Sequence, residues 1–216
     1  MPSMDNDLFD ATLLRSALER AASHGWRRMT VVDAARDAGL SLETARRRAP
    51  CKAMILLTLG RLADEAALVE DESEGSVREK LFDMLMRRLD VFQQYREGVR
   101  SVLRAVPMDP PLAILLGGAT LESMKWIANA AGLETNGLVG GLRLQALLGV
   151  WTMTLRAWDK DDSQDMGTTM AALDQALDRA ARVIGLAPAA PQTPAPGGGY
   201  DAGTDPLVDL PLEPSF

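Results

Sequence analysis

Apolar residues recur every three or four positions along most of the chain, a spacing typical of amphipathic helices. One stripe shows the spacing clearly: Val77, Leu81, Leu85, Leu89 and Phe92. No long stretch alternates between polar and apolar residues, as a half-buried strand would. The pattern between Leu8 and Ile184 therefore predicts nine helices and an all-α fold.

Glycine, proline and capping residues set the expected ends of these helices. Gly25 ends the first helix, Pro50 suits the first turn of the fourth, and Ser163 suits the N-cap of the last. The predicted ranges are about 7–23, 30–38, 41–48, 50–71, 97–106 and 112–131, and apolar stripes over 77–92, 147–158 and 166–184 mark the other three helices.

Two of the predicted helices are short and joined by a tight turn. Thr30 can cap the first, Gly39 suits the left-handed conformation of the turn, and Ser41 can cap the second. The second helix carries three consecutive arginines at positions 46–48. This arrangement indicates a helix-turn-helix.

Such a motif reads double-stranded DNA by placing the first residues of its second helix at base edges and nearby cations at phosphates. Leu42, Glu43 and Thr44 would then lie nearest the groove. We expect these DNA-binding residues: Thr30, Ser41, Leu42, Glu43, Thr44, Arg46, Arg47, Arg48 and Lys52. Two copies of the motif, related by two-fold symmetry, would bind a palindromic operator.

The charge distribution agrees with a local anion-binding element. The chain has a formal net charge of −7, which argues against a protein that coats nucleic acid over its whole surface. Residues 26–52 nevertheless hold seven basic and three acidic side chains, a net charge of +4. Residues 187–216 hold four acids, no base and seven prolines, and predict a disordered tail.

The run from Thr30 to Ser41, with Thr44, Lys52 and Ile55, resembles the DNA-binding signature of TetR-type transcriptional regulators. The resemblance covers roughly residues 8–186 and implies a TetR-like fold. It implies a helix-turn-helix domain at 1–52, an effector-binding and dimerisation domain at 53–186, and the tail at 187–216. The expected function is a dimeric repressor that a small apolar or amphipathic effector releases from its operator.

The sequence also departs from that signature. At Arg46 the family usually has tyrosine, which touches phosphate, and an arginine can make the same contact. At Ala49 the family usually has phenylalanine, so we expect Trp26, Met29 or Met54 to fill the space.

A second resemblance leads to an alternative function. The segments His24–Trp26, Gly39–Ser41 and 162–165 resemble an accessory protein of coenzyme Q biosynthesis that has the same fold and binds isoprenoid lipid. In that interpretation the helix-turn-helix is vestigial. The arginine-rich second helix favours the regulator, as does the acidic, proline-rich tail where the lipid-binding family has an amphipathic membrane-docking helix.

The larger domain offers two further sets of candidates. Methionines, leucines and aromatic residues suit an adaptable apolar cavity for a small-molecule or lipid effector. The expected pocket residues are Met84, Phe92, Met108, Leu116, Met124, Trp126 and Trp151. Stripes in the last two helices predict a homodimer built on a four-helix bundle. The expected dimer residues are Leu147, Trp151, Trp158, Met166, Met170, Leu173 and Leu177.

Little in the sequence points to other chemistry. His24 is the one histidine and Cys51 the one cysteine, so neither a zinc site nor a disulfide is expected. We expect no enzyme activity, no catalytic residue, no metal and no cofactor. No uncharged apolar run reaches 18 residues, so we expect no membrane span. The single cysteine favours a cytoplasmic protein.

Overall fold

The computed structural model describes residues 2–69, 75–163 and 165–184. In this part the chain forms nine α-helices, one 3-10 turn and no strand. The helices are α1 (Pro2–His24), α2 (Val31–Asp37), α3 (Leu42–Arg48), α4 (Lys52–Ala67), α5 (Val77–Gln94), α6 (Arg96–Ala105), α7 (Pro110–Ala130), α8 (Gly137–Lys160) and α9 (Gly167–Ile184). The predicted all-α fold is confirmed, and the predicted tail lies outside the described residues.

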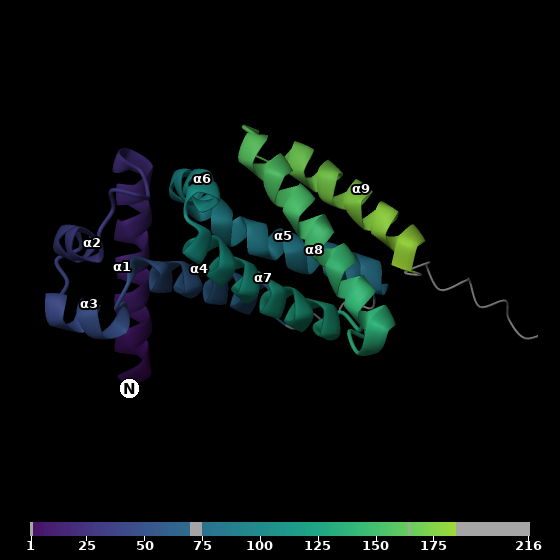
Figure 1. Cartoon of the computed structure of the whole chain (residues 1–216), viewed down its shortest axis with the longest axis horizontal. Helices are drawn as coiled ribbons and strands as arrows, with labels where there is room; N and C mark the ends of the chain where they lie inside the picture. The colour runs from purple at the N-terminus through teal and green to yellow at the C-terminus, as the bar shows by residue number, and fades with distance from the viewer. Residues whose placement is uncertain (1, 70–74, 164, 185–216) are drawn as a thin grey trace, which may run out of the picture.

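The helices form two units that share α4. Figure 1 shows α2 and α3 packed beside α1 at one end of the molecule. Helix α4 passes α1 and continues into a larger bundle, where it packs against α5 and α7. Helices α8 and α9 form the most extensive pair of the bundle, and α6 packs against α1. Both α4 and α6 therefore contact the small unit and the bundle.

Several helix ends differ from the prediction, and α1 begins at Pro2 and not near position 7. Helix α4 begins at Lys52 with Cys51 as its N-cap, so Pro50 precedes the helix. The same helix ends at Ala67 and not near 71, with Leu68 as its C-cap. Helix α9 begins at Gly167, and Ser163 does not cap it. Asp161 performs that function from outside the helix, because its Oδ2 accepts the backbone N–H of Thr169 at 2.7 Å.

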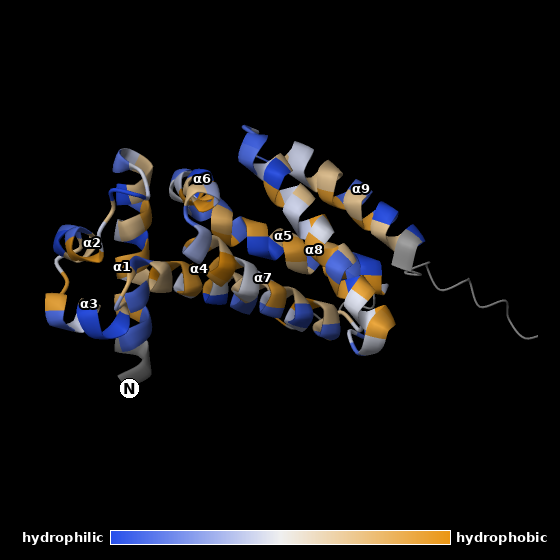
Figure 2. Cartoon of the chain, viewed as in Figure 1, coloured by the Kyte–Doolittle hydropathy of each residue, from blue (hydrophilic) through white to orange (hydrophobic). Residues whose placement is uncertain are grey.

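Small side chains allow the helices of the small unit to approach closely. Ala34, Ala35 and Ala45 are buried, and Trp26 and Met29 are buried in the same core. Of the three residues expected to fill the space at Ala49, Trp26 and Met29 are buried and Met54 is exposed. Figure 2 shows α3 to be largely hydrophilic beside apolar stretches of α1 and α4.

One glycine fixes the packing of α6 on α1. A Cβ added at Gly98 would lie 2.6 Å from the carbonyl oxygen of Leu18 and 2.7 Å from its Cβ. Real Cβ atoms do not approach that closely, so only glycine allows this contact. The backbone N–H of Trp26 also donates to Ser101 Oγ at 2.8 Å, which joins the small unit to α6 a second time.

The apolar stripes of α8 and α9 pack mostly inside the subunit. Of the seven residues expected at a dimer interface, six are buried within the single chain: Leu147, Trp151, Trp158, Met166, Leu173 and Leu177. Met170 is the exception, at 36% exposure. These stripes are therefore buried faces within the chain, and Trp151 and Trp158 of α8 contact Phe92 of α5.

Helix α8 is long and apolar enough to cross a bilayer by length and composition. A bent pair, Arg96–Met108 with Pro110–Ala130, passes the same test but turns by 118° at its break. Core helices of proteins outside membranes pass it too, so one or two such helices are weak evidence for a span. The prediction of no span relied on a stricter requirement, an apolar run without charge, and Arg143 interrupts α8.

Candidate nucleic-acid interface and adjoining cavity

Local hydrogen bonds build the turn between α2 and α3. Thr30 Oγ1 accepts the backbone N–H of Asp33 at 3.1 Å, and Ser41 Oγ accepts that of Thr44 at 3.3 Å. Gly39 adopts φ 65°, the left-handed conformation expected for it. Both caps and the turn glycine thus have the local roles that the sequence indicates.

The first turn of α3 faces solvent. Ser41, Leu42 and Glu43 are exposed, and Thr44 is half-buried. Ala45 is buried and holds the opposite side of the helix against the core. An exposed helix N-terminus held on a small packed unit can enter a major groove. This surface is the candidate nucleic-acid interface.

Arg48 was expected to contact DNA, but the structure places it against α1. Its Nε donates to Asp10 Oδ1 at 2.6 Å and its Nη2 donates to Asp10 Oδ2 at 2.5 Å. This hydrogen-bonded pair raises the pKa of Arg48, although burial acts in the opposite direction. The side chain therefore fixes the end of α3 on α1, and its charge is neutralised within the protein.

The other two arginines of α3 differ in their freedom. Arg46 Nη1 donates to the carbonyl oxygen of Pro50 at 2.6 Å, a contact that bridges the turn into α4. Arg47 pairs with Glu43 one helical turn earlier at 3.2 Å, and both side chains are mostly exposed, at 65% and 86%. Exposed ion pairs of this kind contribute little to stability and separate easily. Arg47 is therefore the arginine of α3 best placed to reach DNA.

Lys52 also has a structural role in this arrangement. Its Nζ donates to the carbonyl oxygens of Trp26 at 3.2 Å and Arg27 at 3.4 Å. The ammonium lies 5.3 Å from the centre of the Trp26 ring. Lys52 thus ties the start of α4 to the turn after α1, which positions the helix that follows α3.

Two exposed arginines near α2 were counted in the basic segment but not named as DNA contacts. Arg28 and Arg36 are exposed, and neither makes an ion pair within the described part of the chain. Both side chains are free of ion pairs in this part of the chain, whereas Arg48 is neutralised by Asp10, and Arg46 and Lys52 donate to backbone carbonyl oxygens. The charge count identifies the basic segment 26–52. The side-chain contacts are needed to show which of its cations already have a partner within the protein.

A cavity of about 820 Å³ lies in the bundle and opens toward solvent. Its wall is formed by residues of α4, α5, α6, α7 and α8. The volume lies within the range of sites that hold small molecules, roughly 300–1,000 Å³. Both helices that contact the small unit, α4 and α6, therefore border the cavity.

The structure brings together part of the predicted pocket. Four of the seven expected residues border the cavity: Phe92, Leu116, Trp126 and Trp151. Met124 is fully buried in the core, Met84 packs partly buried against that core, and Met108 is exposed beside Arg27. These three methionines do not border the cavity.

The cavity wall also holds a polar cluster that the helical spacing of the sequence does not predict. Arg88 on α5 is 3% exposed and forms an ion pair with Asp64 on α4. Ser123 on α7 donates its hydroxyl to Asp64 Oδ2 at 2.6 Å. We call these three residues the Arg88 cluster. It joins three helices across one side of the cavity.

Aromatic rings cover the guanidinium of Arg88. Its Cζ lies 5.1 Å from the centre of the Trp151 ring and 5.8 Å from that of Phe92. Burial lowers the pKa of Arg88 to about 10, so the group remains charged at neutral pH. The Nε atom is buried and donates no hydrogen bond within the described residues. A charged, incompletely satisfied donor therefore borders an apolar cavity.

Two arginines of α6 bind the turn between α8 and α9. Arg96 Nη2 donates to the carbonyl oxygens of Trp158 and Asp161. Arg100 Nε donates to the carbonyl oxygen of Asp159 at 2.8 Å, and its Nη2 donates to Asp162 at 3.0 Å. Helix α6 is thus fixed to the α8–α9 turn on one side and packed on α1 on the other.

Comparison with solved structures shows the same fold in three TetR transcriptional regulators. The regulator from Nitrosomonas europaea aligns with 80% of this chain and 98% of its own, at 21% identity and a TM-score of 0.66. One from Rhodococcus sp. RHA1 aligns with 82% and 97%, at 15% identity and a TM-score of 0.60. A putative TetR-family regulator from Rhodococcus sp. aligns with 80% and 98%, at 19% identity and a TM-score of 0.53.

Neither a family model nor a curated protein matches the sequence. The structural likeness spans nearly the whole length of each regulator, so it includes both the small unit and the bundle. The expected TetR-like fold is therefore confirmed. At these identities the likeness is one of fold.

Proposed function

We propose that this chain is a TetR-type transcriptional repressor. It binds a palindromic operator as a homodimer and releases it when a small apolar or amphipathic molecule occupies the cavity. Residues 1–52 would bind DNA, and residues 53–186 would bind the effector and form the dimer. A protein with this function works beside the DNA, so a cytoplasmic location is part of the proposal.

The observation that carries the proposal is the position of α3. Its capped N-terminus is exposed on a small packed unit, and Arg28, Arg36 and Arg47 add free or loosely held positive charge near it. Base contacts from Leu42, Glu43 and Thr44 would specify sequence, and the exposed arginines would hold phosphates. Arg46, Arg48 and Lys52 would position α3.

The cavity supplies a route for control. An effector that presses on α4 or α6 acts on helices that also contact α1. The Gly98 contact and the hydrogen bond from Trp26 to Ser101 transmit a displacement of α6 to the small unit. In a dimer such displacements change the spacing of the two recognition helices, and an operator accepts only one spacing.

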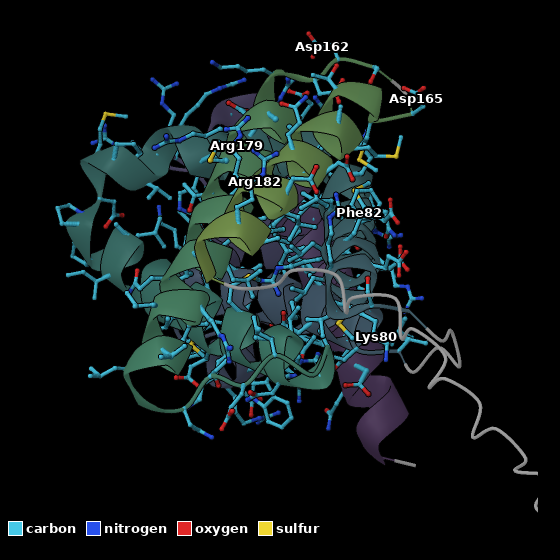
Figure 3. The ribbon with its side chains drawn as sticks, turned by 90° about the vertical axis from the view of Figure 1, so that its right-hand side faces the viewer. Lys80, Phe82, Asp162, Asp165, Arg179 and Arg182 are labelled. Carbon is cyan, nitrogen blue, oxygen red and sulfur yellow. The ribbon has the colours of Figure 1, made fainter. Side chains whose placement is uncertain are left out.

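The dimer surface we propose is the outward face of α8, because the inward stripes pack within the subunit. Leu138 and Leu142 are 91% and 66% exposed, and Gly149 leaves open space at the same face. Exposed apolar side chains beside a glycine suit a second helix at close range. Along α9, Figure 3 shows Arg179 and Arg182 distant from Asp162 and Asp165 at the α8–α9 turn. An antiparallel two-fold pairing would bring the arginine end of one copy toward the acidic turn of the other.

DNA binding is tested by fluorescence anisotropy with duplexes from the upstream region of the encoding gene and with scrambled duplexes, at about 50 and 200 mM salt. We expect a preference for the native duplex that persists at the higher salt. Arg47→Glu should abolish the preference because it places a negative charge at the phosphates. Lys125→Glu makes the same charge change on exposed α7 and should bind normally. Equal binding to both duplexes would contradict the proposal.

The dimer is tested by analytical ultracentrifugation. Gly149→Arg should give a monomer, because nothing in the subunit lies within 4 Å of the added Cβ and the arginine would obstruct only a partner. Gly118→Arg on α7 is the matched control, with the same open space around its Cβ. A monomeric wild-type protein, or a dimer that tolerates Gly149→Arg, would exclude this surface.

The second candidate function is lipid binding with a helix-turn-helix that no longer binds DNA. The internal contacts of Arg46, Arg48 and Lys52 favour it, because Asp10 neutralises Arg48 and backbone carbonyls hold the other two side chains within the protein. The apolar wall of the cavity is equally compatible with an isoprenoid chain. Weak, low-salt DNA binding without sequence preference would support this function and contradict the regulator.

A further inference from the structure

The Arg88 cluster indicates which chemical class the cavity binds. Arg88 borders the cavity, is charged and almost fully buried, and has an Nε that donates no hydrogen bond within the described residues. A buried donor of this kind is costly unless an acceptor meets it. The remaining wall is dominated by leucine, valine and aromatic side chains. A ligand that satisfies both features has an apolar body and one strong acceptor.

The covering rings restrict how that acceptor approaches. Phe92 and Trp151 lie over the guanidinium, so a ligand group reaches Arg88 at its edge, where the N–H groups point. Asp64 forms an ion pair at Nη1, but neither Nη1 nor Nε donates a hydrogen bond within the described residues, so the guanidinium has donors left for a second acceptor. A guanidinium edge matches the two oxygens of a carboxylate better than it matches a single hydroxyl or carbonyl oxygen.

We propose that the cavity binds an apolar carboxylic acid whose carboxylate binds Arg88 in competition with Asp64. Asp64 can yield, because its side chain is 25% exposed and keeps the hydroxyl of Ser123 as a partner. The other charges of the wall lie toward the mouth, where Arg61 and Glu65 pair at 2.5 Å and Glu122 is exposed. They leave Arg88 as the buried cation of the wall.

The competition would also connect the ligand to the recognition helix. Asp64 belongs to α4, and α4 begins four residues after α3 ends. A carboxylate that takes Arg88 from Asp64 loosens the link between α4 and α5 and allows α4 to shift with the small unit. This regulatory step rests on the proposed function, whereas the ligand preference does not depend on DNA.

The test measures binding of decanoate and decanamide to the full-length protein without DNA. Isothermal titration gives the affinities, and tryptophan fluorescence provides a second readout because Trp126 and Trp151 border the cavity. The two probes share one apolar chain and differ in charge. We expect decanoate to bind at least about tenfold more tightly, the factor typical of a hydrogen bond to a charged group.

Variants assign that preference to its residues. Arg88→Gln should remove the preference and leave decanamide binding close to normal. Asp64→Asn should strengthen decanoate binding, since the competitor loses its charge. Arg61→Gln, at the exposed mouth, is the control and should change neither affinity by more than about twofold. Circular dichroism checks that each variant is folded. If Arg88→Gln does not fold, the expected rise in decanoate affinity of Asp64→Asn becomes the deciding measurement.

Each result bears on one proposal alone. Equal affinities for the two probes in wild type would overturn the inference, as would a preference that survives in folded Arg88→Gln or weakens in Asp64→Asn. DNA binding that fails while decanoate binds through Arg88 would overturn the regulator and leave the carboxylate site intact. Operator binding without any preference for decanoate would support the regulator and overturn the carboxylate site.

Discussion

The small unit and the bundle each contain an arginine that pairs with an aspartate, and the surroundings give the two pairs different consequences. Arg48 and Asp10 are partly exposed, at 26% and 20% of their side chains. Arg88 is 4% exposed and Asp64 25%. The pairing raises the pKa of Arg48, whereas burial lowers that of Arg88 to about 10. Water solvates the charges of the Arg48–Asp10 pair. The buried charge of Arg88 must instead be compensated by neighbouring protein groups.

The difference shows why charge alone does not identify function. The small unit has many arginines, but several of them hold helices in place. The bundle has few charges on its cavity wall, and one of them is buried with a donor unsatisfied. A buried charge with incomplete partners is the more informative observation, because burial makes it costly and a ligand is one way to compensate it.

The largest effect is expected where the two regions touch. Gly98→Val should destabilise the protein by about 3 kcal/mol, because its side chain would collide with the backbone of Leu18. Urea unfolding at fixed protein concentration measures the loss. Gly118→Val has open space around its Cβ and is the control, with a change of less than about 1 kcal/mol. Equal stability of the two variants would mean that α6 and α1 can separate without cost.

The buried pair gives the next largest effect. Asp64→Leu should cost about 2 kcal/mol, less than the loss of a fully buried partner, because Asp64 is 25% exposed although the Arg88 charge is left buried without it. The double variant Arg88→Met with Asp64→Leu should recover most of that loss, because two apolar side chains need no counter-charge. Chemical unfolding of both single variants and of the double variant completes the cycle. Additive losses would show that the two side chains do not depend on each other.

These two regions also show how much the sequence could predict. The caps at Thr30 and Ser41 and the turn at Gly39 depend on neighbouring residues, so the helix-turn-helix was predictable. The α8 and α9 stripes were predicted as a dimer interface, and six of their seven residues are buried within the single chain. The sequence could not tell whether another helix of the chain or a second copy covers them, because a helical stripe has the same spacing in both cases.

The cavity depended on contacts between distant segments. Arg88 lies three residues after Leu85 and four before Phe92, on the buried side of α5. A charged residue within an apolar stripe was the available signal. Its partner Asp64 lies on a different helix, and Ser123 on a third, so the cluster itself required the tertiary structure. The three methionines outside the cavity were predicted from composition alone, and composition does not give the direction of a side chain.

The carboxylate of Asp161 accepts hydrogen bonds and forms no ion pair within the described residues. Asp161 is buried, which raises its pKa, but hydrogen bonds from Ser163 and Thr169 lower the pKa well below its usual range. The folded state therefore favours the ionised form. This stabilisation is present above the unfolded pKa of about 3.9 and is lost as the pH falls toward the folded value.

Asp161→Asn should therefore cost about 2 kcal/mol at pH 7. The side-chain NH₂ of asparagine would face the backbone N–H groups of Ser163 or Thr169, which now donate to the carboxylate. The variant should also lose less stability than wild type between pH 7 and pH 3. Urea midpoints at both pH values measure the difference. Asp165→Asn changes an exposed carboxylate of the same turn and should follow wild type. A steeper acid loss in Asp161→Asn would reverse the sign of this argument.

The smallest effect on stability is expected at the partly exposed Arg48–Asp10 pair, where DNA preference should change more than the free energy of unfolding. Asp10→Asn should cost less than about 1 kcal/mol, since water can replace the lost partner of Arg48. The freed guanidinium no longer holds the end of α3 on α1, so operator preference should fall even though the net positive charge of the unit rises. Anisotropy with native and scrambled duplexes separates these effects. Greater affinity for both duplexes with preference unchanged would mean that Arg48 supplies charge to DNA and does not position α3.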